Sequence, residues 1–428
     1  MWKDDRKKRI ILNILLVCVI LIIVAGLGMA MLYVRRQTEA HDEELSVIYV
    51  QQQQKQTEAR QESLDTIQAE YDKDMATVAE FLPGIVCWGD SLTLGSSGNR
   101  AYPSVLKTYL DTYFCDIYDF RSTILNAEEY SRLKWDDYKV KVPVINMGAG
   151  PEDSYTILGR AGAMPYVTGE DLTIPAQMEP VEIKLQSESG NPVYPLTGGD
   201  AGVNNVLLGG VEGTITIDSS AYSYNSYQYF FTRSEAGQEV YVPAGTVVKT
   251  AATDQYRDYI HVVCIGTYGT FTNADELVQQ TKTLLSRQAK NPERFIVLGL
   301  CSVDRSTYNT YSLDVIDTAM MQAFGNRYIN VRKYLVEDGL ADAGITPTSD
   351  DKLRMPQGMV PASFISTSHA IELNGKAYTL IGKLVYDRME SLGYFDEVYD
   401  ELGIRETTLQ ILKEDPNYFD GIIRNALQ

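Results

Sequence analysis

The sequence predicts an α/β protein with a doubly wound parallel sheet, an inserted all-β domain, and a transmembrane helix and helical stalk in front of them. Three observations lead to this prediction. After residue 84, short apolar runs alternate with longer helix-like runs, which is the pattern of a parallel sheet covered by helices on both faces. Residues 156–257 interrupt that alternation with strand-like runs rich in Gly, Thr, Val and Tyr. Residues 10–34 form an apolar run long enough to cross a bilayer as a helix.

The apolar run of residues 10–34 is predicted to be an uncleaved membrane anchor. It is longer than the apolar part of a secretory signal, and Met29–Met31 is a poor cleavage site. Residues 1–9 contain five basic side chains, whereas only Arg35 and Arg36 closely follow the run. Because the more basic flank stays in the cytoplasm, we expect a single-pass protein with residues 1–9 inside the cell and the large domain outside.

The chain is acidic, with 38 Lys and Arg against 57 Asp and Glu and a net charge of −19. Most of the acidic excess lies beyond the apolar run. An acidic surface disfavours nucleic acid and anionic lipid as partners. It suits a soluble domain held away from a membrane, and the same charge could equally serve solubility alone.

Residues 35–81 are predicted to form a helical stalk. The segment is rich in Gln and Glu and contains neither Pro nor Gly, and sparse apolar residues recur along it. Their spacing is too irregular to define a heptad repeat. The stalk therefore allows self-association through a weak coiled coil, but it predicts no oligomeric state.

The α/β domain is expected over residues 82–155 and 258–394. Its predicted strands are five short apolar runs, at residues 84–88, 142–145, 260–265, 294–300 and 328–331. Its predicted helices lie between or after them, at residues 102–114, 273–288, 313–324 and 375–392. Residues 347–367 are expected to be a loop, either a lid or a plain connection.

Residues 156–257 are predicted to be the β-rich insertion, and residues 395–428 an acidic helical tail. Within the insertion, the stretch 222–231 is unusually aromatic. Exposed tyrosines there could stack on sugar rings, so a carbohydrate is one candidate partner. The alternative is packing of alternate faces within a β-sandwich.

The most informative motif is Gly-Asp-Ser-Leu at Gly89–Leu92. It directly follows the apolar run 84–88, so Ser91 should lie on the turn at the C-terminal end of a buried strand, where open α/β sheets bind ligands. His369 is the best candidate for a base, because His41 lies in the stalk and His261 lies within a predicted strand. A serine paired with a distant histidine is the minimal outline of a serine hydrolase.

This serine turn, together with a histidine before the final helix, resembles the SGNH (GDSL) hydrolase superfamily over residues 84–394, apart from the insertion. Residues 373–378 are similar to the end of that family's histidine motif, with Ala370–Glu372 inserted in front of them. Residues 157–162 resemble the start of an insertion in bacterial members of the family.

The resemblance implies a flavodoxin-like sheet and ester or amide cleavage through an acyl-enzyme. Ser91 would be the nucleophile, and His369 would take its proton and later return it to the leaving group. The family's oxyanion hole consists of the serine backbone N–H, a glycine N–H after the second strand and an Asn side chain after the third. A carboxylate three residues before the histidine orients that base.

Three positions depart from this pattern. The donor glycine aligns with Pro151, which has no N–H, so Gly150 or Gly148 would have to substitute. Tyr268 stands in place of the Asn, and its hydroxyl could donate from a longer side chain. Ser366 stands where the orienting carboxylate is expected. On this resemblance, Ser91, Gly150 and Tyr268 form the oxyanion hole and Ser366 is the neighbour of the base.

These departures leave two functional hypotheses. The first is an extracytoplasmic ester hydrolase that acts on acyl groups of cell-envelope or carbohydrate substrates. The second is a catalytically impaired protein of the same fold that serves as a membrane-anchored, glycan- or protein-binding ectodomain. Loss of one oxyanion donor costs roughly 100- to 1,000-fold in rate, and loss of the orienting carboxylate about 10,000-fold. No metal motif is present, since the chain has neither H-E-x-x-H nor paired cysteines, and no cofactor is expected.

Overall fold

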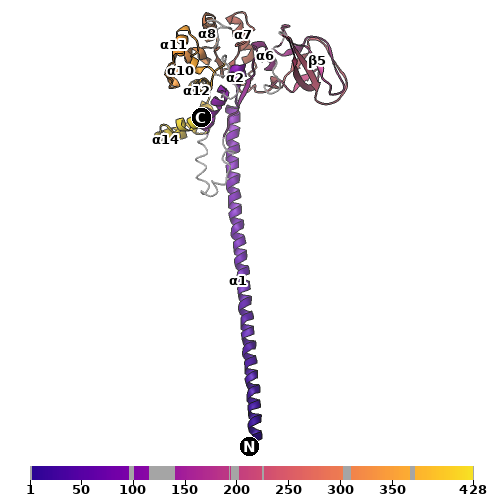
Figure 1. Ribbon diagram of the computed structural model, residues 1–428, viewed down its shortest axis with the longest axis vertical. Coiled ribbons are helices and arrows are strands. Elements are labelled where there is room, and N and C mark those ends of the chain that lie inside the picture. Colours follow the sequence, from indigo (N-terminus) through magenta and orange to yellow (C-terminus); the bar gives the residue numbers. More distant parts are fainter. Residues whose placement is uncertain are drawn as a thin grey trace. The chain divides into compact units, whose positions relative to one another are not determined.

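The structure is a computed structural model of the whole chain (Figure 1). It describes residues 2–95, 101–114, 140–191, 193, 202–223, 226–301, 310–366 and 372–427. The contacts within the chain separate a first unit, which ends at Glu70, from a second, which begins at Tyr71. The two units are described separately below.

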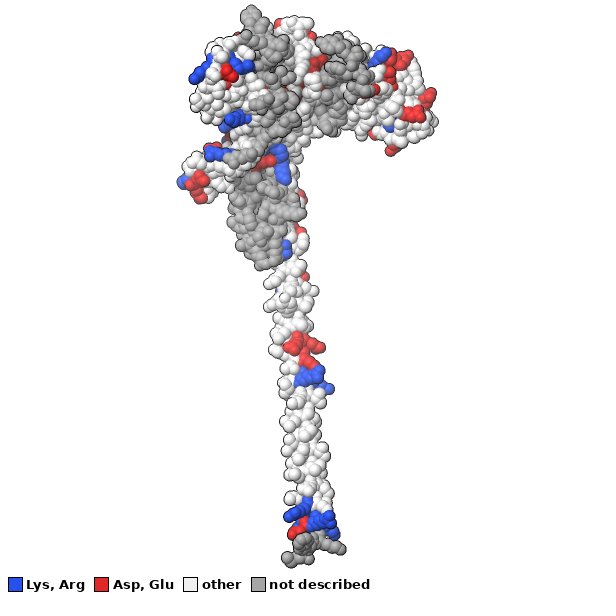
Figure 2. Space-filling view, in the orientation of Figure 1, with Lys and Arg blue, Asp and Glu red and all other residues white. Residues whose placement is uncertain are grey.

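Residues 2–70 of the first unit are part of one continuous helix, α1 (Trp2–Phe81), which extends into the second unit. No proline interrupts the chain before Pro83, so nothing in the sequence forces a break. Between Arg9 and Arg35 the helix carries no charged residue, and this length is the uncharged band near the N-terminal end of α1 in Figure 2. Within the described part of the chain, α1 is the one helix long and apolar enough to cross a membrane.

The predicted stalk, residues 35–81, is helical throughout. Its last turns belong to the second unit, where Val78 and the following Leu82 are buried in a hydrophobic core. The end of the stalk is therefore a structural part of the folded domain and not a linker to it.

The second unit contains a five-stranded sheet in the order β14-β13-β12-β1-β2, and all its neighbouring strands are parallel. This confirms the prediction of a mixed α/β fold with a parallel sheet. The central strand β1 is buried at every residue. The bounds of the strands are β1 Ile85–Gly89, β2 Val144–Gly148, β12 Ile260–Cys264, β13 Phe295–Leu298 and β14 Tyr328–Ile329.

Helices cover both faces of this sheet because successive strand residues point to opposite faces. Ile85 and Cys87 belong to one hydrophobic core, whereas Val86 and Trp88 belong to another. The first core includes side chains from α3 (Tyr102–Phe114), α9 (Val331–Glu337), α10 (Gly339–Asp342) and α12 (Gly375–Ser391). The second includes side chains from α6 (Ser154–Arg160), α7 (Ala274–Leu285) and α8 (Thr310–Phe324).

The β-rich part has its own sheets and its own core. A seven-stranded sheet has the order β5-β9-β8-β7-β11-β3-β6, and β4 pairs with β10 in a second sheet. All of these pairs are antiparallel. The strands are β3 Tyr166–Thr168, β4 Leu172–Ile174, β5 Val181–Ile183, β6 Leu185–Ser187, β7 Val206–Leu208, β8 Val211–Ser223, β9 Ser226–Arg233, β10 Val240–Val242 and β11 Val247–Lys249.

Two details of the insertion differ from the sequence analysis or refine it. The first strand begins at Tyr166, because α6 precedes it and packs its Ile157 and Leu158 into the core of the α/β part. In the aromatic stretch, Tyr229 and Phe231 are buried in the core of the β-rich part. For these two residues the packing explanation holds, and they are not available to stack on a sugar.

The C-terminal segment is helical as predicted, but it is not a peripheral tail. Its helices are α13 (Asp396–Glu401), α14 (Ile404–Glu414) and α15 (Tyr418–Ala426). Phe395, Tyr399, Phe419 and Ile423 are all buried in the same core as α3 and α12. Their spacing of four residues places each pair on one helical face, so the segment completes that core.

The expected loop at residues 347–367 also contains regular structure. A short helix, α11 (Ser349–Arg354), begins at a capping box in which Thr348 and Asp351 satisfy each other's backbone N–H groups. Two 3₁₀ turns follow, at Met355–Gln357 and Ala362–Phe364. Further 3₁₀ turns lie at Ala251–Thr253 and Gly325–Arg327. Residues 347–366 are thus a structured connection.

Candidate active site

Ser91 lies where the sequence analysis places it, at the C-terminal end of the central strand β1. It is the first residue of the short helix α2 (Ser91–Leu94). Asp90 caps this helix, since one of its carboxylate oxygens accepts a hydrogen bond of 2.9 Å from the backbone N–H of Leu92. The cap fixes the backbone on both sides of the serine.

Glycines allow the chain after β2 to lie directly against this turn. A Cβ added to Gly148 would stand 2.1 Å from the backbone nitrogen of Leu94, and one added to Gly150 would stand 2.8 Å from Cβ of Ser91. Both distances are too short for any other residue. Gly150 therefore lies beside the nucleophile, whereas the neighbouring Pro151 is exposed.

The structure distinguishes the two glycines considered as replacement donors. The backbone N–H of Gly148 donates to the side-chain oxygen of Asn146 over 2.9 Å, so Gly148 is already engaged. Gly150 lies beside Ser91, and its N–H donates no hydrogen bond to another described residue. Gly150 is the better replacement for the donor that Pro151 cannot provide.

Tyr268 reaches Ser91. It follows β12, beyond the positive-φ residue Gly266, and its hydroxyl lies 2.8 Å from Oγ of Ser91. Burial raises the pKa of the Tyr268 phenol, the hydrogen bond with Ser91 lowers it, and the charges of Asp90 and Glu372 raise it. The phenol therefore stays protonated near neutral pH and can act as a hydrogen-bond donor.

Asp90 brings a buried carboxyl group next to the nucleophile. It has no solvent exposure, and burial raises its pKa to about 6, although contacts with Thr267 and Leu92 limit the rise. Its charge in turn raises the pKa of Tyr268. Asp90 is therefore both the cap of α2 and a source of negative charge that acts on Tyr268.

Replacement of Asp90 by asparagine should stabilise the protein in a pH-dependent manner. The folded-state pKa is raised from 3.8 to about 6, so the contribution of Asp90 to stability is greatest below pH 4 and is lost as the pH rises through 6. Asparagine keeps the capping oxygen without the charge. At pH 8 the variant should gain up to about 3 kcal/mol in free energy of unfolding, and at pH 4 it should gain little. Chemical denaturation of the full-length protein in detergent measures both values.

The matched control is Asp171→Asn. Asp171 is exposed, and its pKa is lowered by hydrogen bonds from the Tyr241 hydroxyl and the Ala244 N–H. Removing its charge should not stabilise the protein at pH 8. A gain for Asp90→Asn that is the same at pH 4 and pH 8 would contradict the explanation based on a buried charge.

His369, the predicted base, lies in residues 367–371, outside the described part of the chain. Ser366, its predicted neighbour, is described and buried. The backbone N–H of Ser366 donates to the carbonyl of Glu372 over 2.8 Å, and Ile365 and Leu373 form an antiparallel bridge. Ser366 therefore lies opposite Glu372, which the sequence analysis treated only as part of an insertion.

The other two histidines are outside this site, as expected. His261 is fully buried in β12 and pairs through Nε2 with the carbonyl oxygen of Tyr256 at 3.1 Å. Burial lowers its pKa to about 4, so it stays neutral. His261 is therefore a neutral core residue. His41 lies on the exposed surface of α1.

A buried ion pair is hydrogen-bonded to the end of β1, directly before the turn that carries Ser91. Nε of Arg160 donates to Glu152 over 2.9 Å, and both side chains are completely buried. The same guanidinium group donates a longer bond of 3.4 Å to the carbonyl of Gly89 and lies 5.8 Å from the ring centre of Trp88. The pair thus connects α6 to the residue directly before Asp90 and Ser91.

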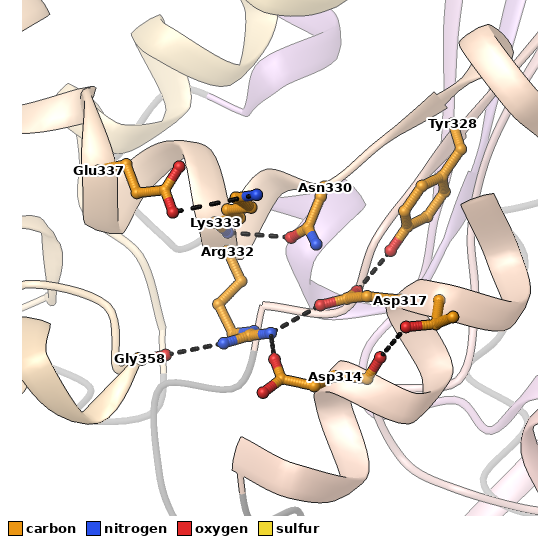
Figure 3. Close-up of polar contacts among 9 residues, drawn as sticks. Asp314, Asp317, Tyr328, Asn330, Arg332, Lys333, Glu337 and Gly358 are labelled. Carbon is orange, nitrogen blue, oxygen red and sulfur yellow. Dashed lines mark hydrogen bonds and ion pairs between the residues drawn. The ribbon is translucent and has the colours of Figure 1, made fainter.

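A second polar network connects α8, β14 and α9 (Figure 3). Arg332 donates to Asp314 over 2.5 Å, to Asp317 over 2.7 Å and to the carbonyl of Gly358 over 3.0 Å. The hydroxyl of Tyr328 donates to the other oxygen of Asp317 over 2.5 Å. Arg332 thus joins both carboxylates of α8 to the carbonyl of Gly358, and we interpret the network as a structural crosslink.

Among the described residues, no group of three or more His, Cys, Asp or Glu side chains could hold a metal ion. Two surface hollows of about 500 and 430 Å³ lie elsewhere. One is lined by the start of α7 and by α8, and the other by α8, α9 and α12. Ser91 lines neither of them.

No protein-family model matches this chain, and no curated protein or solved structure is significantly similar to it. The resemblance to SGNH hydrolases therefore depends on the motifs of the sequence. What the site can do has to be argued from the contacts of Ser91 with Tyr268 and Gly150.

Proposed function

We propose that the protein is a membrane-anchored serine ester hydrolase of the SGNH type that removes acyl groups from cell-envelope or carbohydrate substrates outside the cell. The observation that carries the proposal is the distance of 2.8 Å between the Tyr268 hydroxyl and Oγ of Ser91. This contact brings a phenol that stays protonated within hydrogen-bond reach of the proposed nucleophile, and Tyr268 stands in the sequence where the family has its Asn. The substrate class follows from the expected location and from the family resemblance.

The order of the strands supports the proposal. The strands lie side by side in the order β2-β1-β12-β13-β14. From the boundary between β1 and β12, successive strands of the chain are added outward in both directions. This is the flavodoxin-type order, and ligands bind such sheets at that boundary, beyond the carboxyl ends of the strands. Ser91 follows β1 and Tyr268 follows β12. The two residues thus come from the two strands that flank the expected binding position.

In the proposed reaction, Oγ of Ser91 attacks the ester carbonyl while His369 takes its proton. The oxygen of the tetrahedral intermediate accepts hydrogen bonds from the Tyr268 hydroxyl and from backbone N–H groups of Ser91 and Gly150. His369 then protonates the departing alcohol, and an acyl group remains on Ser91. Water, deprotonated by His369, attacks this acyl-enzyme. When the tetrahedral intermediate breaks down, His369 gives the proton to Oγ of Ser91 and the acid is released.

Covalent labelling of the serine tests this function directly. A fluorophosphonate probe should react with Ser91 of the full-length protein in detergent, with loss of fluoride, because only an activated serine attacks it. Mass spectrometry should find the adduct on the peptide that contains Ser91. Ser223→Ala, which changes a serine of β8, should label like the wild type, and Ser91→Ala should not label. An unlabelled wild type that also lacks esterase activity would favour a binding ectodomain instead.

The proposed location gives a further prediction. A tag at the N-terminus should be protected from protease added to intact cells, whereas a tag at the C-terminus should be removed. The reason is that the basic residues before the apolar part of α1 keep the N-terminus in the cytoplasm. Immunoblotting before and after lysis measures both. Deletion of residues 10–34 should move the protein out of the membrane fraction. Protection of the C-terminal tag in intact cells would contradict the proposed orientation.

A further inference from the structure

Tyr268 lies on a tight turn between β12 and α7. The N–H of Gly269 donates to the carbonyl of Gly266 over 3.1 Å, so Tyr268 is the third residue of this turn. Both glycines have positive φ angles, and so does the next residue, Thr270, with a φ of 67°. A positive φ is unusual for a residue other than glycine, and for a β-branched residue it is strained. Contacts from outside the turn must therefore hold Thr270 in this conformation.

Gln280 supplies such contacts from α7. Its side-chain N–H donates to the carbonyl of Thr270 over 2.8 Å, and its Oε1 accepts a hydrogen bond from the hydroxyl of Ser154 over 2.6 Å. Because a carbonyl can only accept, the first bond fixes the orientation of the amide and leaves its oxygen for Ser154. Gln280 and Ser154 are both buried, so these bonds lie in a region of low dielectric constant, where they are stronger than in water.

Ser154, the first residue of α6, contacts the turn a second time. Its Oγ lies 2.8 Å from the hydroxyl oxygen of Thr270 and 3.2 Å from the carbonyl oxygen of Gly269. Asp153 caps α6 directly before it and accepts a hydrogen bond of 2.8 Å from the backbone N–H of Thr156. The turn that carries Tyr268 is thus connected to two helices, α6 and α7, through buried polar side chains.

We propose that Gln280 is a positioning residue of this site, which holds the turn at Thr270 and thereby keeps the hydroxyl of Tyr268 at Ser91. The proposal rests on the proposed hydrolase function. Tyr268 is exposed, and its hydroxyl lies at the far end of a long side chain, so a small rotation of the backbone displaces it from Oγ of Ser91. Groups that act in catalysis need to be held within about 0.5 Å of their productive position.

Hydrolysis of p-nitrophenyl acetate by the full-length protein in detergent tests the proposal. Gln280→Met keeps the length of the side chain but removes both of its hydrogen bonds. It should lower kcat with little change in KM, and by no more than the roughly 100- to 1,000-fold expected for loss of the Tyr268 hydroxyl. In a Tyr268→Phe background the same change should have no further effect on kcat, because Gln280 acts only through that hydroxyl.

Gln288→Met is the matched control. Gln288 is also buried, and its side chain donates to two backbone carbonyls, those of Tyr259 and Arg294, over 3.0 and 2.9 Å. Tyr259 precedes β12, whereas Tyr268 follows it. Gln288→Met should therefore lower the unfolding midpoint about as much as Gln280→Met and leave kcat unchanged. If Gln288→Met lowers kcat as much as Gln280→Met does, lost stability explains the effect and the inference is wrong.

Relief of the strain at Thr270 gives a second comparison. Glycine adopts a positive φ without steric cost, so Thr270→Gly should restore part of the kcat lost in Gln280→Met. If Gln280→Met does not fold, Ser154→Ala, which removes one hydroxyl of the network, takes its place in the same comparison with Tyr268→Phe. Turnover that depends on Ser91, but with kcat unchanged in Gln280→Met or lowered equally in the Tyr268→Phe background, would overturn this inference alone. Wild-type turnover no higher than that of Ser91→Ala would overturn the hydrolase function and this inference with it.

Discussion

Replacement of Tyr268 by phenylalanine should lower kcat for ester hydrolysis by roughly 100- to 1,000-fold, the usual cost of losing one oxyanion donor. The change removes only the hydroxyl, which lies 2.8 Å from Oγ of Ser91. KM should change little, since the hydroxyl is needed most when negative charge develops on the substrate oxygen. Initial rates of p-nitrophenyl acetate hydrolysis by the full-length protein give both constants.

Two comparisons make this result specific. Tyr241→Phe removes another exposed hydroxyl, one that is hydrogen-bonded to Asp171 in the β-rich part, and it should leave the rate unchanged. Tyr268→Asn introduces the residue type that SGNH hydrolases have at the corresponding position, and it should recover some of the activity lost in Tyr268→Phe if a shorter donor can be accommodated. Tyr268 as a whole is 37% exposed, so neither variant at this position should alter the unfolding midpoint greatly. A rate for Tyr268→Phe within twofold of the wild type would exclude it as a donor.

The sequence predicts the sheet well because each strand is a short apolar run with clear ends. The predicted helix 102–114 has the same bounds as α3, since its apolar residues recur with helical spacing. The sequence does not predict α9. This helix begins directly after β14 and its capping residue Asn330, so the strand and the helix form one apolar stretch without a visible boundary. It also leaves α11 as a loop, because that helix is short and polar and depends on its capping box.

The sequence predicts only those parts of the site that depend on residues adjacent in the chain. Ser91 follows from a motif and the strand in front of it. The choice of Gly150 over Gly148 depends on the Asn146 side chain that engages Gly148, and the reach of Tyr268 depends on the packing of two neighbouring strands. Gln280 lies within a predicted helix. Its contacts with the turn that carries Tyr268, however, depend on the packing of α6 against α7, which no sequence pattern reveals.

Replacement of Arg160 by methionine should lower the free energy of unfolding by about 3–5 kcal/mol, because removal of one partner leaves a buried charge without compensation. Arg160 and Glu152 are both fully buried, and their contact measures 2.9 Å. Methionine fills a similar volume and can still pack against Trp88. The loss should therefore come from the stranded carboxylate of Glu152, and chemical denaturation of the full-length protein measures it.

A double variant separates the charge from the packing. Glu152→Leu combined with Arg160→Met removes both charges from the same buried space, and it should be more stable than Arg160→Met alone because no uncompensated ion remains. Lys184→Met, which breaks an exposed ion pair with Glu170, should leave the denaturation midpoint unchanged. If the double variant instead has a lower free energy of unfolding than Arg160→Met alone, the two side chains stabilise the protein through packing and not through their charges. Arg160 also donates a hydrogen bond to the carbonyl of Gly89, two residues before Ser91. Fluorophosphonate labelling of Ser91 in the double variant measures whether the ion pair is also needed for the reactivity of this serine.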